Sequence, residues 1–255
     1  MVPMRETEAM VLRSHPLGES DRIVTFLTRT SGKVRGVAKG ARRSRRRFGS
    51  NLETLSRVRL SYFEREGAEL ARIEGAELLE SFYTLQEDPE RGAVLACMAE
   101  VADAFAREQQ EDEPYFRLLH TVLRAIREGL DLGLGARYFE IWTLRLHGVL
   151  PPLTVCSSCG SDLGSQGGLF HRREGGVACR RCVPGATPGS VALPKESLAV
   201  VAAILKESPV ALIGRALPPR ALQPLQTFAE AMFLDLTERR FKSYDVLRAL
   251  RGARH

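Results

Sequence analysis

The sequence has no apolar run long enough to cross a membrane, because charged residues interrupt every hydrophobic stretch before about 18 residues. Its first residues, MVPMRETEAM, carry acids where a secretory signal peptide needs a basic start and an apolar run. We therefore expect a cytoplasmic protein with no membrane partner. We expect a folded chain, since 44% of its 255 residues are hydrophobic and 27% are charged, which is ordinary for a globular protein.

Motifs of common enzyme classes are also missing. The chain has no P-loop, no H-E-x-x-H motif and no H-x-E motif paired with P-C-x-x-C. Two acidic groups are conceivable Mg²⁺ ligands, namely Glu6 with Glu8, and the cluster 111–113. The first is more simply the polar face of a strand, and the second precedes a helix start, where negative charge favours the helix dipole. The sequence therefore favours a binding protein that is not an enzyme.

Acidic residues are absent from the segment 33–47, KVRGVAKGARRSRRR. The segment carries eight cations, and subtracting +8 from the net charge of +6 leaves −2 for the rest of the chain. Clustered cations repel one another unless a polyanion neutralises them, and the guanidinium fork suits phosphate. The segment predicts contact with a nucleic-acid backbone, and a solvated surface loop is the alternative. The predicted DNA-binding residues are Lys33, Arg35, Lys39, Arg42, Arg43, Arg45, Arg46 and Arg47.

The pattern of this segment changes after residue 39. In KVRGVAK, alternation puts Lys33, Arg35 and Lys39 on one face of a strand, whereas ARRSRRRFGSN has no period and predicts a loop. No aromatic residue occurs in the segment before Phe48, so any base stacking must come from elsewhere. Strand aromatics are more often core residues. The candidates for stacking are Phe26, Tyr62 and Phe63.

Cysteine is scarce, with five residues, yet four of them form two C-x-x-C pairs. Each pair can present two thiolates to one ion, and four thiolates leave no open position, which is typical of a structural Zn²⁺ site. Two disulfides or a redox dithiol are the alternatives, and a reducing compartment disfavours disulfides. The fifth cysteine, Cys97, lies on an apolar helix stripe and is expected in the core. The predicted Zn²⁺ ligands are Cys156, Cys159, Cys179 and Cys182.

The residues between the two pairs predict two short strands around Gly175 and Gly176. His171 is expected on the surface, not among the ligands. Arg172 and the nearby Arg173, Arg180 and Arg181 are placed to offset the negative charge of four thiolates.

Strands and helices occupy different parts of the chain. From residue 6 to 80, short apolar segments alternate with turn residues, and from about residue 90 the apolar period is helical, ending in a long helix near 219–250. Strands followed by helices favour an α+β protein with separately packed regions over a doubly wound sheet. The expected strands are 8–14, 21–30, 33–39, 57–65 and 68–78.

Three short motifs stand in order near the N-terminus: G-E-S-D at 18–21, T-x-x-x-G-K at 28–33 and K-G-A-R at 39–42. Together with the helical middle, the paired C-x-x-C motifs and the C-terminal helix, they resemble the RecO family of bacterial recombination mediators. The resemblance implies an N-terminal OB-fold β-barrel, followed by an α-helical domain with an inserted zinc ribbon. The expected ranges are 1–80 for the OB fold, 81–150 and 185–255 for the helical domain, and 151–184 for the ribbon.

The resemblance also implies a function in DNA repair and recombination. A protein of this family binds single-stranded and double-stranded DNA and anneals complementary strands coated with single-strand-binding protein. With RecR as a partner it helps to load the recombinase RecA, and it is expected to be nucleoid-associated. A sequence-specific zinc-containing regulator and a zinc-dependent nucleic-acid enzyme are the alternatives from other classes.

Overall fold

The computed structural model describes residues 3–43, 48, 51–64, 67–172, 175–183, 185, 189–218 and 220–253. The chain forms two compact units. The first unit joins the N-terminal half to the C-terminal helix, and the second contains the residues between them. The units are Met1–Arg127 with Phe241–His255, and Glu128–Arg240.

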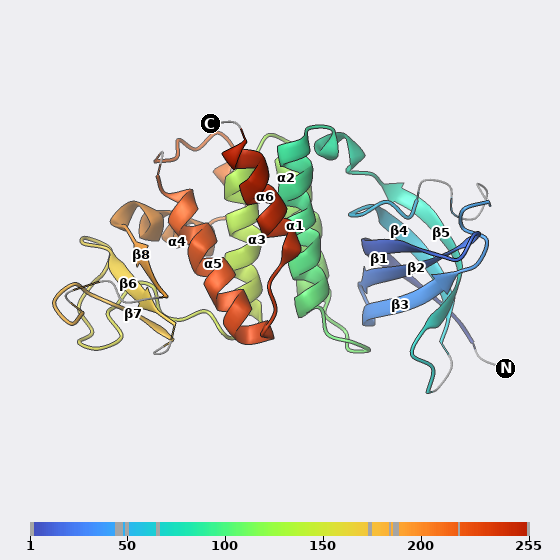
Figure 1. Ribbon diagram of the computed structural model, residues 1–255, viewed down its shortest axis with the longest axis horizontal. Helices are drawn as coiled ribbons and strands as arrows, with labels where there is room; N and C mark the ends of the chain where they lie inside the picture. The colour runs from blue at the N-terminus through green and yellow to red at the C-terminus, as the bar shows by residue number, and fades with distance from the viewer. Residues whose placement is uncertain are drawn as a thin grey trace. The chain divides into compact units, whose positions relative to one another are not determined.

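The first unit is built around a closed five-stranded barrel (Figure 1). The strands are hydrogen-bonded in the order β1-β2-β3-β5-β4, and β1 closes the barrel by pairing with β4. All neighbouring pairs are antiparallel except β3 with β5. This is the architecture of an OB fold, and the expected α+β fold class is confirmed. The strands are β1 (Met4–Leu17), β2 (Asp21–Thr28), β3 (Gly32–Ala38), β4 (Arg57–Phe63) and β5 (Ala71–Glu80).

Alternating side chains fill the barrel along β3. Val34, Gly36 and Ala38 are buried, whereas Arg35 is exposed, so the alternation predicted for this strand is confirmed. Glycine is needed at residue 36 because a Cβ atom there would lie 2.8 Å from the backbone carbonyl oxygen of Ala71 on β5, besides 2.4 Å from the Cδ1 atom of Ile73. The cations of this strand are therefore directed outward while its small residues let β3 and β5 approach each other.

Helices complete the first unit. The helix α1 begins after Asp88, whose side chain accepts a hydrogen bond from the Arg91 amide. Just beyond the end of α1, the carbonyl oxygens of Arg107 and Gln110 come so close to Gly32 that a Cβ atom there would lie 2.2 Å from each. The barrel and the following helices thus form one unit, although the sequence-based ranges divide them at residue 80. The elements are η1 (Tyr83–Gln86), α1 (Pro89–Phe105), α2 (Glu113–Arg127) and α6 (Lys242–Gly252).

An ion-pair network ties the end of β5 to α2. The Glu80 carboxylate lies 2.6 Å from His120 Nε2 and 2.5 Å from Arg127 Nη2, and Arg57 Nε of β4 lies at 3.3 Å. Burial raises the pKa of Glu80, but the hydrogen bonds from His120 and Arg127 outweigh it and hold the pKa below its ordinary value. This carboxylate therefore stabilises the first unit in its ionised form.

The second unit combines helices with a three-stranded sheet of order β7-β6-β8 (Figure 1). The helix α3 begins after Asp131, whose carboxylate accepts a hydrogen bond from the Leu134 amide at 2.8 Å. Phe170 of β6 packs edge-on against Phe228 of α5, with ring centroids 4.9 Å apart. The small sheet is thereby attached to the helices. The elements are α3 (Leu132–Leu146), β6 (Gly168–His171), β7 (Gly176–Ala178), β8 (Ser190–Leu193), α4 (Lys195–Lys206), η2 (Val210–Leu212) and α5 (Leu222–Thr237).

Two details differ from the sequence-based expectation. The single long helix expected near 219–250 is wrong, since α5 ends at Thr237 and α6 begins at Lys242. The break occurs where Glu238 adopts a left-handed conformation with φ 54°, while its amide still bonds the Leu234 carbonyl oxygen. The two strands expected between the cysteine pairs are present, but β8 was not predicted.

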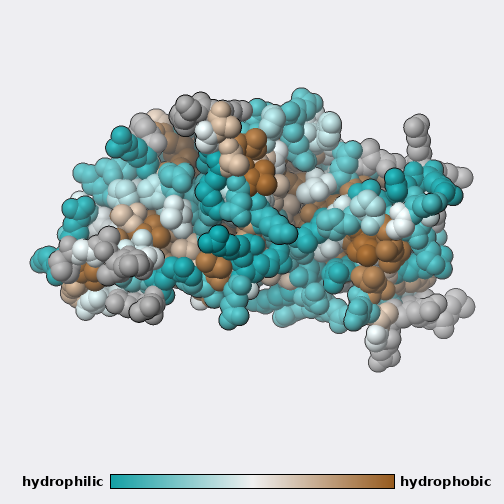
Figure 2. All heavy atoms as spheres, viewed as in Figure 1, coloured by the Kyte–Doolittle hydropathy of each residue, from teal (hydrophilic) through white to brown (hydrophobic). Residues whose placement is uncertain are grey.

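Hydrophilic residues cover most of the face of the molecule seen in Figure 2. Among the described residues, every helix is too short or too polar to cross a bilayer.

Candidate nucleic-acid interface and metal centre

The predicted cations of β3 do not share one environment. Arg35 and Lys39 are exposed. The Lys33 side chain is only 15% exposed, and its Nζ atom donates a hydrogen bond to the Asp103 carbonyl oxygen at 3.0 Å and lies 3.6 Å from the Glu108 carboxylate. Lys33 thus links β3 to the end of α1. Of these three cations, Arg35 and Lys39 are the two that face solvent.

A carboxylate joins the turn after β1 to the start of the Arg-rich loop. The Oδ1 atom of Asp21 accepts hydrogen bonds from the Gly40 amide at 2.8 Å and from the Ser20 hydroxyl at 2.9 Å. These bonds lower the pKa of Asp21, and the nearby charge of Lys39 acts in the same direction. The Arg42 amide also donates to the Ser20 carbonyl oxygen at 3.0 Å. We call this arrangement the Asp21 clamp; it fixes the backbone from which the first loop arginines project.

The Arg-rich loop is anchored at both ends. Arg42 and Arg43 are exposed at its start, and Arg43 Nη2 lies 3.9 Å from the carboxylate of Glu19, which is also exposed. Phe48 is fully buried in the barrel core, together with Leu52. The predicted DNA-binding residues Arg45, Arg46 and Arg47 lie outside the described residues. The described part of the loop thus begins at the Asp21 clamp and returns to the barrel at Phe48.

The aromatic candidates for stacking are mostly core residues. Phe26 and Tyr62 are fully buried, which excludes their ring faces from contact with a base. Phe63 is half-buried and lines a groove of about 540 Å³ with Lys39 and Arg72. Tyr83 of η1 is 57% exposed, and the sequence analysis did not include it among the candidates for base stacking.

The acidic residues considered as Mg²⁺ ligands have protein partners instead. The Glu8 carboxylate lies 2.9 Å from Arg57 Nη1, and Glu6 accepts a hydrogen bond from the Ser61 hydroxyl at 3.2 Å. In the cluster 111–113, Glu113 faces Arg29 and Arg117 at 3.5 Å and 3.6 Å. These contacts agree with the strand-face and helix-start interpretations.

The four cysteines of the two C-x-x-C pairs converge on one point. Their sulfur atoms all lie within 4.8 Å of one another, and the Cys159 and Cys179 sulfurs are 3.8 Å apart. Zn–S bonds of about 2.3 Å in a tetrahedron separate the sulfurs by about 3.8 Å, so the spacing fits a zinc ion. Within the described parts of the chain, this is the only group of three or more metal-ligating side chains that meets.

Hydrogen bonds to the sulfur atoms favour the thiolate form of Cys156 and Cys179. Hydrogen bonds from the Cys182 amide and the Ser161 hydroxyl lower the pKa of Cys179 to about 5. The Cys179 amide donates to Cys156 Sγ at 3.2 Å and lowers the pKa of Cys156. The neighbouring sulfurs of Cys159 and Cys179 raise the pKa of Cys182 to about 12. Four thiolates therefore need a bound cation to be ionised together, which is what a zinc ion supplies.

The tight turns that carry the cysteines are formed in two ways. Gly160 has φ 70° and its amide bonds the Cys156 carbonyl oxygen at 2.9 Å, as expected for a glycine after the first pair. Val183 makes the equivalent bond to the Cys179 carbonyl oxygen at 3.0 Å without a positive φ. Both pairs thus form similar turns from different residues.

Two expectations about the surroundings of the cysteines need correction. His171 is buried, with 8% of its surface exposed, so its expected surface position is wrong, although it does not join the cysteine cluster. The Arg172 guanidinium hydrogen-bonds the Asp235 carboxylate of α5, which raises the pKa of Arg172. Arg172 therefore holds the small sheet to α5. Arg180 and Arg181, which lie between the second pair of cysteines in the sequence, are exposed, and Arg173 lies outside the described residues.

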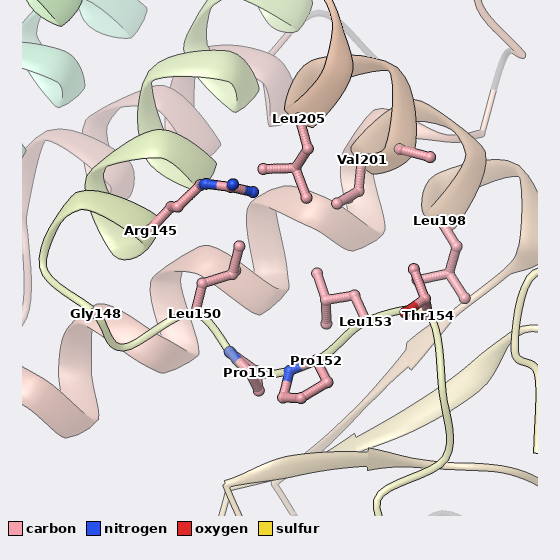
Figure 3. Close-up of a pocket in the computed structure, with 11 residues that line it drawn as sticks. Arg145, Gly148, Leu150, Pro151, Pro152, Leu153, Thr154, Leu198, Val201 and Leu205 are labelled. Carbon is pink, nitrogen blue, oxygen red and sulfur yellow. The ribbon is translucent and has the colours of Figure 1, made fainter. Parts of the chain in front are cut away.

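The second unit also contains an apolar groove of about 380 Å³ (Figure 3). Val201 and Leu205 of α4 face Leu150 on the segment that follows α3, and Leu198 lies near Thr154 on the same segment. Arg145 lies beside the groove, with its guanidinium 5.0 Å from the centre of the Trp142 ring. The groove is lined by aliphatic side chains with one cation beside them.

Comparison with known families accounts for both halves of the chain. The family model described as Recombination protein O N terminal matches residues 1–82, and that described as Recombination protein O C terminal matches residues 86–245. The chain belongs to the RecO family. Its G-E-S-D and K-G-A-R motifs, which carried the resemblance in the sequence, are the two sides of the Asp21 clamp.

Curated relatives support the same assignment, and the three described next are each named DNA repair protein RecO. The protein from Koribacter versatilis is 39% identical over 176 residues, covering 69% of this chain and 71% of the relative. The protein from Anaeromyxobacter sp. is 37% identical over 213 residues, covering 82% of each. The protein from Symbiobacterium thermophilum is 34% identical over 254 residues, covering 97% of this chain and 98% of the relative.

Proposed function

We propose that the protein is a recombination mediator that binds single-stranded and double-stranded DNA through the outer face of β3 and the adjoining Arg-rich loop. The observation that carries the proposal is the exposure of four cations on β3 of an OB barrel and on the segment that follows it, namely Arg35, Lys39, Arg42 and Arg43. In OB folds, the face of strands 2 and 3 and the loops beside it bind oligonucleotides. The position of Arg35 on β3, with Lys39, Arg42 and Arg43 on the segment that follows, supports this assignment.

The mechanism follows from phosphate neutralisation. Two complementary strands repel each other, and a loop that contacts phosphates on both lowers that repulsion and releases counterions. We infer that the protein in this way anneals strands coated with single-strand-binding protein. We further propose that it acts with RecR to help load RecA, and that its zinc is structural and completes the small sheet of β6, β7 and β8.

The test replaces four described cations by glutamine and measures affinity for an oligonucleotide at several salt concentrations. Each lost phosphate contact reduces the slope of log K against log salt by about 0.7 for a single strand, so four lost contacts reduce it by about 3. A matched control removes the same formal charge from exposed cations of the second unit and should leave the slope unchanged. The test residues are Arg35, Lys39, Arg42 and Arg43, and the control residues are Lys195, Lys206, Arg220 and Arg240.

The annealing step is measured separately, with two complementary oligonucleotides coated with single-strand-binding protein and no nucleotide present. We expect the wild-type protein to accelerate annealing and the four-cation variant to lose the acceleration. Loss of the same size in the control variant would contradict the assignment of the interface to β3. RecA filament formation on coated DNA, with and without RecR, tests the remaining step.

A further inference from the structure

The first unit has a second groove, distinct from the one that Phe63 and Lys39 line. Its volume is about 590 Å³, and it is lined by residues of β1, β2, η1 and the segments 41–42 and 52–54. Gln86 Nε2 donates a hydrogen bond to the Thr54 carbonyl oxygen at 3.0 Å, which holds one wall in place. This wall of the groove is therefore tied to η1. The lining residues used below are Arg22, Arg42, Glu53 and Tyr83.

The aromatic residue of this groove is held with its ring in solvent. Phe82 is fully buried, and the Arg127 guanidinium lies 5.1 Å from the centre of its ring. The next residue, Tyr83, is 57% exposed and lines the groove. Burial of Phe82 thus fixes the backbone of η1 and leaves Tyr83 facing the groove.

The charges of the groove favour an anion. Arg22 Nε donates to the Ser14 hydroxyl at 2.7 Å and Arg22 Nη2 donates to the Ser14 carbonyl oxygen at 3.1 Å, so this guanidinium is positioned in advance. Arg42 is exposed, and its backbone is held by the Asp21 clamp. Glu53 is the acid in the lining, which leaves a formal charge of +1 from Arg22, Arg42 and Glu53. Neither arginine forms an ion pair with another described residue.

We propose that this groove binds one nucleotide of single-stranded DNA, with the base stacked on Tyr83 and the phosphate held by Arg22 and Arg42. A positively charged groove with an aromatic ring is the combination that binds single strands without sequence preference. Double-stranded DNA has no unstacked base to offer, so the groove selects single strands. The inference rests on the proposed function, and it adds a base contact that phosphate neutralisation alone does not require.

The experiment separates base stacking from phosphate contact. Affinities of the full chain are measured for oligo-dT and for an oligonucleotide of the same length in which every nucleotide is abasic. Tyr83→Ala should weaken oligo-dT binding by roughly 5- to 150-fold and leave binding of the abasic strand unchanged. Tyr83→Phe should retain the affinity, and Tyr83→Leu, which is apolar but has no ring, should lose it. The slope against salt should be the same for all three variants.

A second measurement uses the wild-type protein and so does not depend on folding of a variant. A single strand carrying 5-iodouracil is irradiated in the complex, and the crosslinked residue is identified by mass spectrometry. Crosslinking at Tyr83 supports the groove as the base site, and crosslinking only at other residues overturns it. Equal binding of oligo-dT by wild type and Tyr83→Ala would overturn the groove but leave the proposed function standing, whereas failure of the wild type to bind DNA would reject the proposed function itself.

Discussion

A buried ion pair within α3, which is also hydrogen-bonded to α5, allows a specific prediction for the stability of the second unit. Arg137 is 4% exposed and Glu140 is 1% exposed, and the Arg137 guanidinium hydrogen-bonds both the Glu140 carboxylate and Gln226 Oε1, the latter at 3.1 Å. Arg137→Met keeps an unbranched side chain but removes the charge. The Glu140 carboxylate then stays buried without its guanidinium.

The expected cost is about 3–5 kcal/mol of unfolding free energy, because removing one partner of a buried pair leaves an uncompensated charge. The double variant Arg137→Met with Glu140→Leu removes both charges and should be more stable than the single variant, since a buried pair replaced by apolar residues is often neutral.

Trp142 provides the assay. It is the only tryptophan of the chain, it lies on α3, and its indole Nε1 donates to the Ile204 carbonyl oxygen at 2.9 Å. Its fluorescence during urea denaturation therefore reports unfolding of the second unit, from which the free energy is obtained by linear extrapolation. A loss below about 1 kcal/mol in Arg137→Met, typical of an exposed pair, would refute the reasoning. A double variant as unstable as the single variant would do the same.

Two further predictions concern the metal and the pH dependence. The wild-type protein should carry one zinc ion by native mass spectrometry. Cys156→Ser should lose the ion and expose residues 151–184 to protease, whereas Cys97→Ala should keep the ion. Zinc retained by Cys156→Ser would contradict the ligand assignment. Because the folded pKa of Glu80 lies below its ordinary 4.5, the stability it contributes is complete above pH 4.5 and is lost as the pH falls through the folded pKa. Glu80→Gln should therefore lose less stability on acidification than wild type, measured from urea midpoints, while the exposed Glu77→Gln should follow the wild type.

Features that depend on local sequence patterns were predictable, both in the barrel and in the rest of the chain. The alternation along KVRGVAK depends only on the period of a strand, and the spacing of the C-x-x-C pairs depends only on the reach of two short turns. The position of Cys97 in the core followed in the same way from a helical stripe and is confirmed, with 2% of its surface exposed.

Contacts between distant segments were not predictable. Lys33 lies on a strand face with two other cations. No local pattern indicates that its ammonium group donates a hydrogen bond to Asp103, 70 residues away. The end of α5 carries no glycine or proline, so the left-handed Glu238 gave no signal of a helix break. Exposure of Tyr83 next to a buried Phe82 likewise depends on how η1 meets the rest of the first unit.

The anchoring of the Arg-rich loop has an evolutionary consequence. At one end the loop is held by backbone bonds to Ser20 and Asp21, and at the other by Phe48 within the barrel. These anchors are formed by Ser20, Asp21, Gly40, Arg42 and Phe48. Doubling the length of such a connection costs only about 0.6 kcal/mol of closure entropy. Mutation can therefore change the number of cations in the loop, and with it the affinity for phosphate, while selection for barrel stability acts on other residues.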